Sequence, residues 1–451
     1  MGGIRIHDTL SGELRELDPA GSGTVGIYAC GPTTYGRIHI GNARPYVVFV
    51  LLRRFLAHLG LDPRLVVNVT DINDKIYAAA GEAGVPSDRF AAEMTAADTA
   101  DTDRLGIGRP DAEPKASETI AAIVALIEAL IERGHAYQAN GDVYFRVRSF
   151  DGYGKLSNRD PAEMDQGEEA GTASLKEDPL DFALWKGTKE GEDTAWPSPW
   201  GDGRPGWHIE CSAMAEAELG PEFAIPGGGS DLIFPHHENE IAQTEAARGV
   251  PLARIWMHNG MVQLDREKMS KSEGNIFQLS EALDRYGGPA VVAYLASGHY
   301  RQPLAFSDEA LREAAASVER IRNYTRDAPG GEPDSFARSV RESVLDALAD
   351  DFNTPMAFAH LFGLISEGNK REVAGARAVL EDLLPLFGLE ALLAGEEEAD
   401  DEARAKLAER EHARADKDFE RADALRDELA EMGWEVRDEA GGARLVRRAG
   451  A

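Results

Sequence analysis

Apolar and polar positions follow two different periods along this chain, and each change of period marks a new element. A short apolar run begins at Thr24, a glycine-containing turn follows it, and a helical pattern then covers residues 42–59. Another apolar run covers residues 65–69. Short apolar runs bounded by turns are typical of buried strands, so this stretch predicts a strand–helix–strand unit of an α/β fold.

The pattern is interrupted after this unit and returns much later in the chain. Residues 109–114 break it, a helical stretch covers residues 117–133, and residues 160–173 are polar and typical of a loop. A strand–turn–helix pattern returns at residues 227–247. We therefore expect an insertion that splits one nucleotide-binding fold into two halves.

A helical period dominates the last third of the chain. Four amphipathic patterns follow one another, over residues 307–326, 335–348, 354–366 and 372–386. They indicate a helical bundle. Beyond a charged linker at residues 395–402, a helical pattern over 403–432 leads to a tail in which a glycine pair, 441–442, predicts a hairpin turn.

These patterns predict the domain organisation. The expected boundaries are residues 1–115 and 227–306 for the two halves of the α/β domain, 116–226 for the insertion, 307–394 for the bundle, and 395–451 for the linker and C-terminal domain. A chain of 451 residues is long enough for several domains with substantial cores.

Composition indicates where the protein works. The sequence has no apolar run of membrane-spanning length and no N-terminal signal pattern, so we expect a cytoplasmic protein without membrane contact. In a reducing compartment, its 2 cysteines are better interpreted as metal ligands or thiols than as a disulfide.

The formal net charge of −31 argues against general attraction to nucleic acid, because phosphate binding is normally carried by basic surface. One hypothesis explains this charge by a salt-rich cytoplasm, in which an acidic surface keeps a protein dissolved. Solubility and activity should then rise with added potassium chloride. Full function without salt would contradict the hypothesis.

The two cysteines lie near other potential metal ligands. Cys211 precedes a histidine-rich segment in which His236 and Glu240 stand four residues apart, on one face if the segment is helical. Cys30 ends the first apolar run. The four side chains offer two sulfur, one nitrogen and one oxygen ligand, a set that suits zinc. Two alternatives remain open: both cysteines as small core residues, or a purely structural zinc, since four protein ligands usually close such a site.

Two short motifs offer phosphate contacts. Residues 38–42 join the first strand to its helix, where glycine allows close backbone approach and a helix N-terminus attracts anions. Taken alone, this motif is more typical of an ordinary surface turn. Residues 268–272 place two lysines and two hydroxyls in one loop. Such a loop suits a clamp on a triphosphate, although a solvated loop is the alternative.

In combination these motifs resemble a known family. Residues 39–42 and 268–272 resemble the paired HIGH and KMSKS motifs of class I aminoacyl-tRNA synthetases, and the four metal ligands resemble those of the cysteinyl-tRNA synthetases. The resemblance extends over essentially the whole chain, through residues 67–71, 206–211, 227–243, 347–355 and 415–428.

This resemblance implies a Rossmann-type catalytic domain with a connective insertion, a helical bundle that binds tRNA, and a small C-terminal anticodon-binding domain. It implies that L-cysteine is activated with Mg²⁺-bound ATP and transferred to tRNA(Cys). The expected enzyme is a monomer with one Zn²⁺ per chain, held by Cys30, Cys211, His236 and Glu240.

The resemblance and the residue chemistry together assign further site residues. The expected catalytic groups are His39, Lys268 and Lys271. The expected ATP-binding residues are His39, Gly41, Asn42, Asp231, Lys268, Ser270 and Lys271. Asn42 stands where the motif has histidine, and it donates a hydrogen bond but carries no charge. For Asp231, a helix N-cap is the alternative to a ribose contact.

Contacts to the amino acid and to tRNA are also expected. Thr70, which closes the second strand, and Trp207, four residues before Cys211, are assigned to cysteine; a core position is the alternative for Trp207. The residues assigned to unpaired tRNA bases are Trp434, Arg437 and Arg444, with an ordinary C-terminal arginine cluster as the alternative.

Three other functions fit part of the pattern. The cysteine ligase of mycothiol synthesis resembles the catalytic half of this family, but it attaches cysteine to a glucosamine-inositol and has no need of the C-terminal region. A zinc hydrolase would leave the lysine loop unexplained. A non-enzymatic RNA-binding relative would not need all the catalytic and metal-binding side chains.

Overall fold

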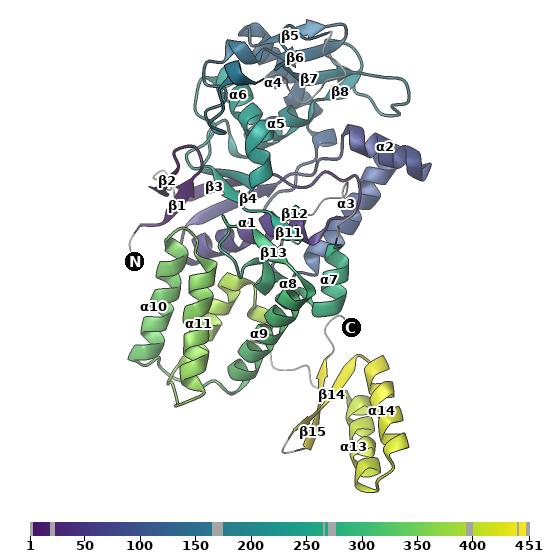
Figure 1. Cartoon of the computed structure of the whole chain (residues 1–451), viewed down its shortest axis with the longest axis vertical. Coiled ribbons are helices and arrows are strands. Elements are labelled where there is room, and N and C mark those ends of the chain that lie inside the picture. Colours follow the sequence, from purple (N-terminus) through teal and green to yellow (C-terminus); the bar gives the residue numbers. More distant parts are fainter. Residues whose placement is uncertain are drawn as a thin grey trace.

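The computed structural model describes residues 3–18, 23–164, 175–264, 267–268, 277–393, 400–439 and 442–447. The molecule is elongated, with the inserted domain at one end, the α/β domain in the middle, and the helical bundle and C-terminal domain following in turn (Figure 1). Among these residues, no helix combines the length and apolar composition needed to cross a membrane.

A parallel four-stranded sheet forms the centre of the molecule. Its strands, in the order β10-β9-β3-β4, are β10 (Met257–Asn259), β9 (Ile225–Gly229), β3 (Thr24–Ala29) and β4 (Asp62–Val67). β3 and β9 pair directly, although the inserted domain separates them in the sequence. The predicted α/β fold interrupted by an insertion is therefore confirmed.

Helix α1 (Ile40–His58) connects β3 to β4 and packs on the sheet. It is buried along most of its length, and Arg44 on it is fully buried. The Arg44 guanidinium donates hydrogen bonds to the carbonyl oxygens of Gly260 at 2.6 Å and His299 at 3.2 Å. Since a buried guanidinium requires such acceptors, these bonds fix the start of α1 against the segment that follows β10.

The inserted domain contains an antiparallel sheet that the sequence pattern did not predict. Its strands, paired in chain order, are β5 (Ala136–Ala139), β6 (Asp142–Phe145), β7 (Phe182–Gly187) and β8 (Gly203–Pro205). Helices α4 (Ile120–Glu132), α5 (Trp207–Leu219) and α6 (Glu238–Arg248) pack with this sheet around one apolar core. The sequence pattern predicted helices α4 and α6 but not α5 or the four strands. Strands this short show little alternation of apolar and polar residues. Most of the predicted loop at 160–173 lies outside the described residues.

Smaller elements surround the central sheet. They are β1 (Arg5–Asp8), β2 (Glu13–Glu16), α2 (Asp74–Ala83), α3 (Ser87–Asp103), β11 (Val262–Leu264), β12 (Glu267–Lys268), α7 (Leu279–Tyr286), α8 (Gly288–Leu295) and β13 (Leu304–Phe306). Helix α2 begins after Asn73, whose side-chain oxygen accepts a hydrogen bond from the Lys75 amide at 3.1 Å. This cap sets the direction of α2 as it leaves the sheet.

The helical bundle follows the predicted amphipathic pattern closely. Its helices are α9 (Asp308–Asp327), α10 (Ser335–Ala349), α11 (Thr354–Gly368) and α12 (Ala376–Leu383). The first three begin at side-chain caps, in which Ser307, Asp334 and Asn353 accept hydrogen bonds from backbone amides. The predicted helix over 372–386 is shorter, because a tighter turn (Leu384–Phe387) containing a proline replaces its end.

The C-terminal domain corrects one prediction. The single helix expected over 403–432 is two helices, α13 (Asp401–Ala415) and α14 (Phe419–Glu431). Lys417 between them has a left-handed φ of 62°, and the Asp418 side chain then caps α14. Strands β14 (Trp434–Glu439) and β15 (Gly442–Arg447) pair as the predicted hairpin. The predicted linker at 395–402 lies mostly outside the described residues.

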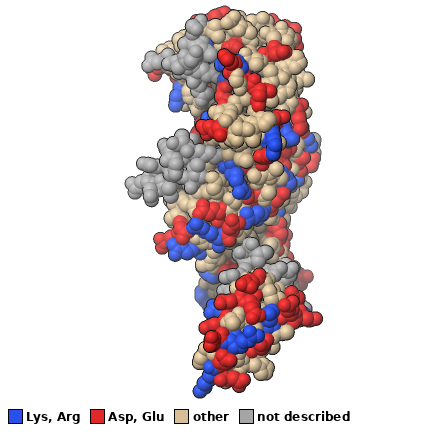
Figure 2. Space-filling view, turned by 90° about the vertical axis from the view of Figure 1, so that its right-hand side faces the viewer, with Lys and Arg blue, Asp and Glu red and all other residues tan. Residues whose placement is uncertain are grey.

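Acidic and basic side chains are interspersed on the face shown in Figure 2, which has no broad, purely basic area. On this face, the acidic side chains of the chain are thus not gathered in one area. Any site for a polyanion on this face therefore depends on local clusters of basic side chains.

Candidate functional site

The four predicted metal ligands come together in one buried cluster. Cys30 follows β3, Cys211 lies in α5, His236 in the turn before α6, and Glu240 in α6. One ligand atom from each lies within 4.8 Å of the others, and all four residues are buried. The Nε2 atom of His236 is 2.9 Å from a Glu240 carboxylate oxygen. The cluster therefore joins the two halves of the α/β domain to the inserted domain.

The spacing of the donor atoms fits a zinc ion. In a tetrahedral site with Zn–S bonds of about 2.3 Å and Zn–O bonds of about 2.0 Å, two sulfurs lie about 3.8 Å apart, and a sulfur and an oxygen about 3.5 Å apart. The Cys30 and Cys211 sulfurs are 3.9 Å apart, and the Cys30 sulfur is 3.5 Å from a Glu240 oxygen. Two sulfurs, one imidazole and one carboxylate also suit zinc chemically.

Additional histidines orient the metal-binding side chains. The Nδ1 atom of His236 lies 2.9 Å from Nδ1 of His208, so its Nε2 atom is directed to the cluster. Nε2 of His237 lies 3.3 Å from the Cys30 sulfur, and Nδ1 of His237 lies 2.7 Å from His258. Burial lowers the pKa of His237 well below its usual value and that of His258 to about 3. Both rings are therefore neutral.

The sequence pattern did not predict His208 and His258 as part of the site. His208 lies on α5, 28 residues before His236, and His258 lies on β10, 21 residues after His237. A signal existed, since the chain has only 11 histidines and four of them meet here. The sequence alone could not pair His208 with His236 or His258 with His237, because these contacts depend on which segments are neighbours in the fold.

Two groups in the cluster have pKa values shifted in opposite directions. The hydrogen bond from the Cys30 thiol lowers the pKa of Cys211 to about 6, despite its burial. The same contact raises the pKa of Cys30 well above its usual value, and burial adds to that effect. One thiolate therefore forms readily even before a metal ion supplies its own charge.

A cavity of about 590 Å³ opens beside the cluster. This volume lies within the range of about 300 to 1,000 Å³ that is typical of small-molecule sites. Six predicted residues line it: Cys30, His39, Gly41, Asn42, Trp207 and Asp231. The cavity adjoins the carboxyl ends of β3 and β9 and the N-terminus of α1. Ligands of parallel α/β sheets bind at this edge.

Residues 39–42 form the start of α1. The His39 ring accepts a hydrogen bond from the Gly41 amide at 3.1 Å, and the Asn42 side-chain oxygen accepts one from the His39 amide at 3.2 Å. A Cβ atom on Gly41 would lie 2.8 Å from the His39 ring, so any larger residue there would displace the ring. Asn42 thus has a structural function that needs no charge, which explains how it can replace histidine.

Three other predicted site residues, Trp207, Thr70 and Asp231, lie in different positions relative to the cavity. Trp207 is half-buried, and its ring centroid lies 4.3 Å from that of His236, at the boundary of cluster and cavity. Thr70 is buried beyond the end of β4 and accepts a hydrogen bond from Asn68 at 3.0 Å. Asp231 is not a helix N-cap, because the turn that contains it, Ser230–Leu232, begins after Gly229.

Models of known families match three parts of the chain. The tRNA synthetases class I (C) catalytic domain matches residues 16–316, the DALR domain residues 343–389, and the cysteinyl-tRNA ligase anticodon binding domain residues 396–445. The cysteine–tRNA ligase of Chromohalobacter salexigens is 46% identical over 96% of this chain and 97% of its own length. The chain belongs to the cysteine–tRNA ligase family.

Other comparisons agree with this family. The cysteine–tRNA ligase of Halorhodospira halophila is 45% identical, over 98% of this chain and 99% of its own. Among solved structures, methionyl-tRNA synthetase from Mycobacterium tuberculosis, in complex with methionyl-adenylate, covers 82% of this chain and 91% of its own, with a TM-score of 0.60 and 16% identity. At that identity the likeness shows the fold alone, which is the predicted class I synthetase fold.

The predicted phosphate-binding loop at 268–272 and the predicted tRNA contacts near the C-terminus are only partly described by the structure. Lys268 belongs to β12, but its side chain is not described, and Ser270 and Lys271 fall within 269–276, outside the described residues. Arg437 and Arg444 are register partners on the hairpin, and their side chains are likewise not described.

Trp434 requires a correction. Its side chain is 4% exposed and packs with Ala403, Leu429 and Leu445 in the core of the C-terminal domain. A buried indole cannot stack on a tRNA base, so the expectation of such a contact was wrong. Its apolar ring joins the hairpin to α13 and α14 instead.

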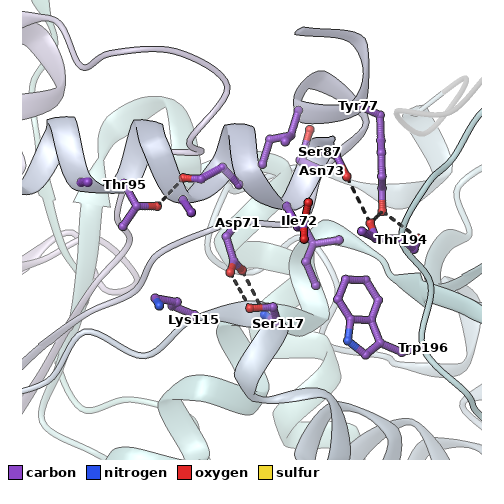
Figure 3. Close-up of a pocket in the computed structure, with 15 residues that line it drawn as sticks. Asp71, Ile72, Asn73, Tyr77, Ser87, Thr95, Lys115, Ser117, Thr194 and Trp196 are labelled. Carbon is purple, nitrogen blue, oxygen red and sulfur yellow. Dashed lines mark hydrogen bonds between the residues drawn. The ribbon is translucent and has the colours of Figure 1, made fainter. Parts of the chain in front are cut away.

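A separate cavity of about 420 Å³ lies between α2, α3 and the segment around Thr194 (Figure 3). Its polar side chains bind one another. The Asp71 carboxylate accepts a hydrogen bond from the Ser117 amide at 3.0 Å, and the hydroxyls of Tyr77 and Thr194 are 2.8 Å apart. These groups therefore hold the wall of this cavity together. The predicted site residues line the cavity beside the metal cluster instead.

Proposed function

We propose that this chain activates L-cysteine with ATP and transfers the cysteinyl group to the 3′ end of tRNA(Cys). One observation carries the proposal: Cys30 belongs to the metal-ligand cluster and also lines the cavity at the start of α1. An amino acid held by its thiol at the cluster would lie beside a nucleotide held at the helix. The anticodon-binding match at residues 396–445 favours tRNA over a glucosamine-inositol acceptor.

Two displacements make up the reaction. First, a carboxylate oxygen of cysteine attacks the α-phosphorus of ATP, the bond to the bridging oxygen breaks, and pyrophosphate leaves. Then a hydroxyl of the terminal tRNA ribose attacks the activated carbonyl carbon and gives up its proton, and AMP leaves. Neither step requires a protein nucleophile, so positioning and charge stabilisation supply the catalysis.

The chain offers groups for each of these tasks. His39 and the backbone amides at the start of α1 would hold phosphate oxygens, because a helix N-terminus attracts anions. Lys268 and Lys271, with Ser270 between them, would neutralise the charge that develops on the phosphates, together with Mg²⁺ bound to ATP. Asp231, which lines the cavity, would accept hydrogen bonds from ribose hydroxyls.

Specificity for cysteine over serine would depend on the metal-ligand cluster. Shape alone discriminates a difference of one atom by only about 1 to 3 kcal/mol. Cys30, Cys211, His236 and Glu240 would hold a zinc ion. The ion would supply a borderline-soft Lewis acid that favours a thiolate over a serine hydroxyl. Trp207 would restrict the size of the side chain. Thr70 is buried and does not line the cavity, so its contact with the polar groups of cysteine stays a prediction from the sequence.

The other parts of the chain would bind tRNA. The helical bundle at 307–394 and the C-terminal domain at 395–451 would contact the body of the tRNA and its anticodon, with Arg437 and Arg444 beside the unpaired bases. A single chain carries all the proposed groups, which is compatible with a monomer. Because tRNA charging serves translation, we place the enzyme in the cytoplasm.

The test is ATP–pyrophosphate exchange, followed by charging of total tRNA in the same preparation. We expect exchange with cysteine to exceed exchange with serine by about 10⁴-fold in kcat/KM, because a site built for one ligand group rejects its analogue strongly. Cysteine-dependent exchange without charging of tRNA would favour the sugar ligase. Absence of exchange in zinc-loaded protein would contradict the proposed activation of cysteine.

A further inference from the structure

Asn259 ends β10 and lines the cavity beside the metal cluster, at the edge formed by the carboxyl ends of the strands. It lies opposite Gly229, the last residue of β9, in the pairing of these two parallel strands. Asn259 is only 2% exposed, so the cavity is its one approach for a ligand. The sequence pattern assigned no function to this residue.

The Asn259 side chain holds one hydrogen-bond acceptor without a partner. Its Nδ2 atom donates to the carbonyl oxygen of Gly260 at 3.1 Å. This bond fixes the orientation of the amide, because the reversed orientation would place Oδ1 against another carbonyl oxygen. Oδ1 is buried and has no hydrogen-bond partner among the residues that the structure describes. An unsatisfied buried acceptor is costly, so it indicates a ligand that donates a hydrogen bond.

Contacts with two other segments hold Asn259 in place. The Gly260 amide donates to the carbonyl oxygen of Tyr300 at 2.7 Å, and the carbonyl oxygen of Gly260 accepts from the buried Arg44 at 2.6 Å. A Cβ atom on Gly260 would collide with the backbone of Gln302, so these two stretches of chain are in direct contact. A rigid wall therefore presents the amide oxygen to the cavity, as precise recognition requires.

The helical bundle, which adjoins the α/β domain (Figure 1), holds the same wall from the other side. The Tyr300 hydroxyl donates to the Asp351 carboxylate at 2.7 Å, and the Arg301 guanidinium pairs with that carboxylate at 2.6 Å. Asp351 lies in the turn between α10 and α11 and has a left-handed φ of 61°. This conformation is uncommon outside glycine, so the contacts around Asp351 maintain it. Asn259 is thus supported by two domains.

The neighbours of Asn259 in the cavity match a nucleoside. A Cβ atom on Gly229 would collide with Oδ1 of Asp231 and would lie 3.3 Å from the sulfur of Met261, so both groups lie against this glycine. Together with Asn259, the wall offers two oxygen acceptors and a thioether. A nucleoside carries hydroxyl and amine donors and an aromatic base, and thioethers contact aromatic rings favourably. Phosphate groups, which are acceptors, fit the start of α1 instead.

We propose that the side-chain oxygen of Asn259 accepts a hydrogen bond from the nucleoside of ATP, given by the exocyclic amine of adenine or by a ribose hydroxyl. The inference rests on the proposed function, which places ATP in this cavity. Asn259 is then a nucleoside-binding residue that acts beside Asp231. The phosphates are held at the start of α1, and the cysteine at the metal cluster.

The test combines substitutions of Asn259 with analogues of ATP that each lack one donor: the triphosphates of purine riboside, 2′-deoxyadenosine and 3′-deoxyadenosine. The measured quantity is kcat/KM in cysteine-dependent pyrophosphate exchange, with each nucleotide in turn. We expect the wild type to use one analogue at least about tenfold less well than ATP, because that analogue leaves the buried oxygen unpaired. In Asn259→Ala this ratio should fall to about twofold or less, because the acceptor is gone. The analogue concerned identifies the donor.

A second substitution and a control complete the experiment. Asn259→Leu keeps a side chain of similar size and decides the question if Asn259→Ala fails to fold, which a melting curve identifies. Asn353→Ala is the matched control, since the Asn353 side chain caps α11 and does not line the cavity. This variant should be less stable than the wild type but should keep the full analogue ratio and the wild-type KM for ATP.

Two results would overturn the inference. One is a wild type that uses all three analogues as well as ATP, and the other is an Asn259 variant that keeps the full wild-type ratios. Both results leave the proposed function standing, because exchange with ATP still occurs. A wild type without any cysteine-dependent exchange would instead contradict the proposed function, and the inference with it.

Discussion

Replacement of Cys211 by serine should remove zinc from the protein and lower kcat/KM for cysteine-dependent pyrophosphate exchange by at least about 100-fold. Loss of an outer partner of a metal ligand already costs up to about 100-fold, and loss of a ligand should cost no less. The Cys211 sulfur is buried, 3.9 Å from that of Cys30, and a hydroxyl there is a poor ligand for zinc. Elemental analysis and the exchange assay measure the two effects.

Ser212→Ala is a suitable control for this variant. Ser212 neighbours Cys211 on α5 and is equally buried, but its hydroxyl donates to the Gln243 side chain at 2.6 Å and not to the cluster. This variant should keep one zinc per chain even if it is less stable. An undiminished zinc content in Cys211→Ser would refute the assignment of Cys211 as a ligand.

Replacement of Lys271 by alanine should lower kcat for pyrophosphate exchange by about 10²- to 10³-fold, because a preorganised charge at the developing oxyanion contributes on that scale. The effect should fall on kcat more than on KM for ATP, since the lysine would act chiefly in the transition state. Zinc content should stay at one per chain, because the cluster lies in other segments.

Lys189→Ala provides the control for charge, since Lys189 is exposed and lines neither of the two cavities. Exchange kinetics at saturating cysteine distinguish the possibilities. If Lys271→Ala raised KM for ATP and left kcat unchanged, the lysine would bind ground state and transition state equally, which contradicts a catalytic role.

Much of the fold follows from long periodic patterns. Helices α1, α9, α10 and α11 begin and end close to their predicted limits, because each presents a continuous apolar face and the last three have strong side-chain caps. The metal cluster was accessible for a different reason. Cysteine is rare in this chain, and His236 and Glu240 stand four residues apart, so residue type and spacing indicated the ligands, and the family resemblance implied the same set.

What escaped prediction depends on contacts between distant segments. The short strands β5 to β8 form a sheet because their side chains meet in one core, and no single strand carries that information. The break at Lys417 depends on a left-handed residue within a sequence that is otherwise helical. The burial of Trp434 follows from the packing of the hairpin on two helices. The sequence alone suggested an exposed ring, because Trp434 lies in a tail that contains several arginines.

The order of the metal ligands along the chain has a consequence for synthesis. Cys30 precedes Glu240 by 210 residues. At about 5 to 20 residues per second, a ribosome releases the last ligand roughly 10 to 40 seconds after the first. For the first 181 residues of that interval, until Cys211 is synthesised, Cys30 has none of the other three proposed ligands. Uptake of a metal ion at the complete cluster would therefore follow synthesis of the inserted domain. A translation product that stops inside the insertion would lack His236 and Glu240 and could not form the complete proposed metal site.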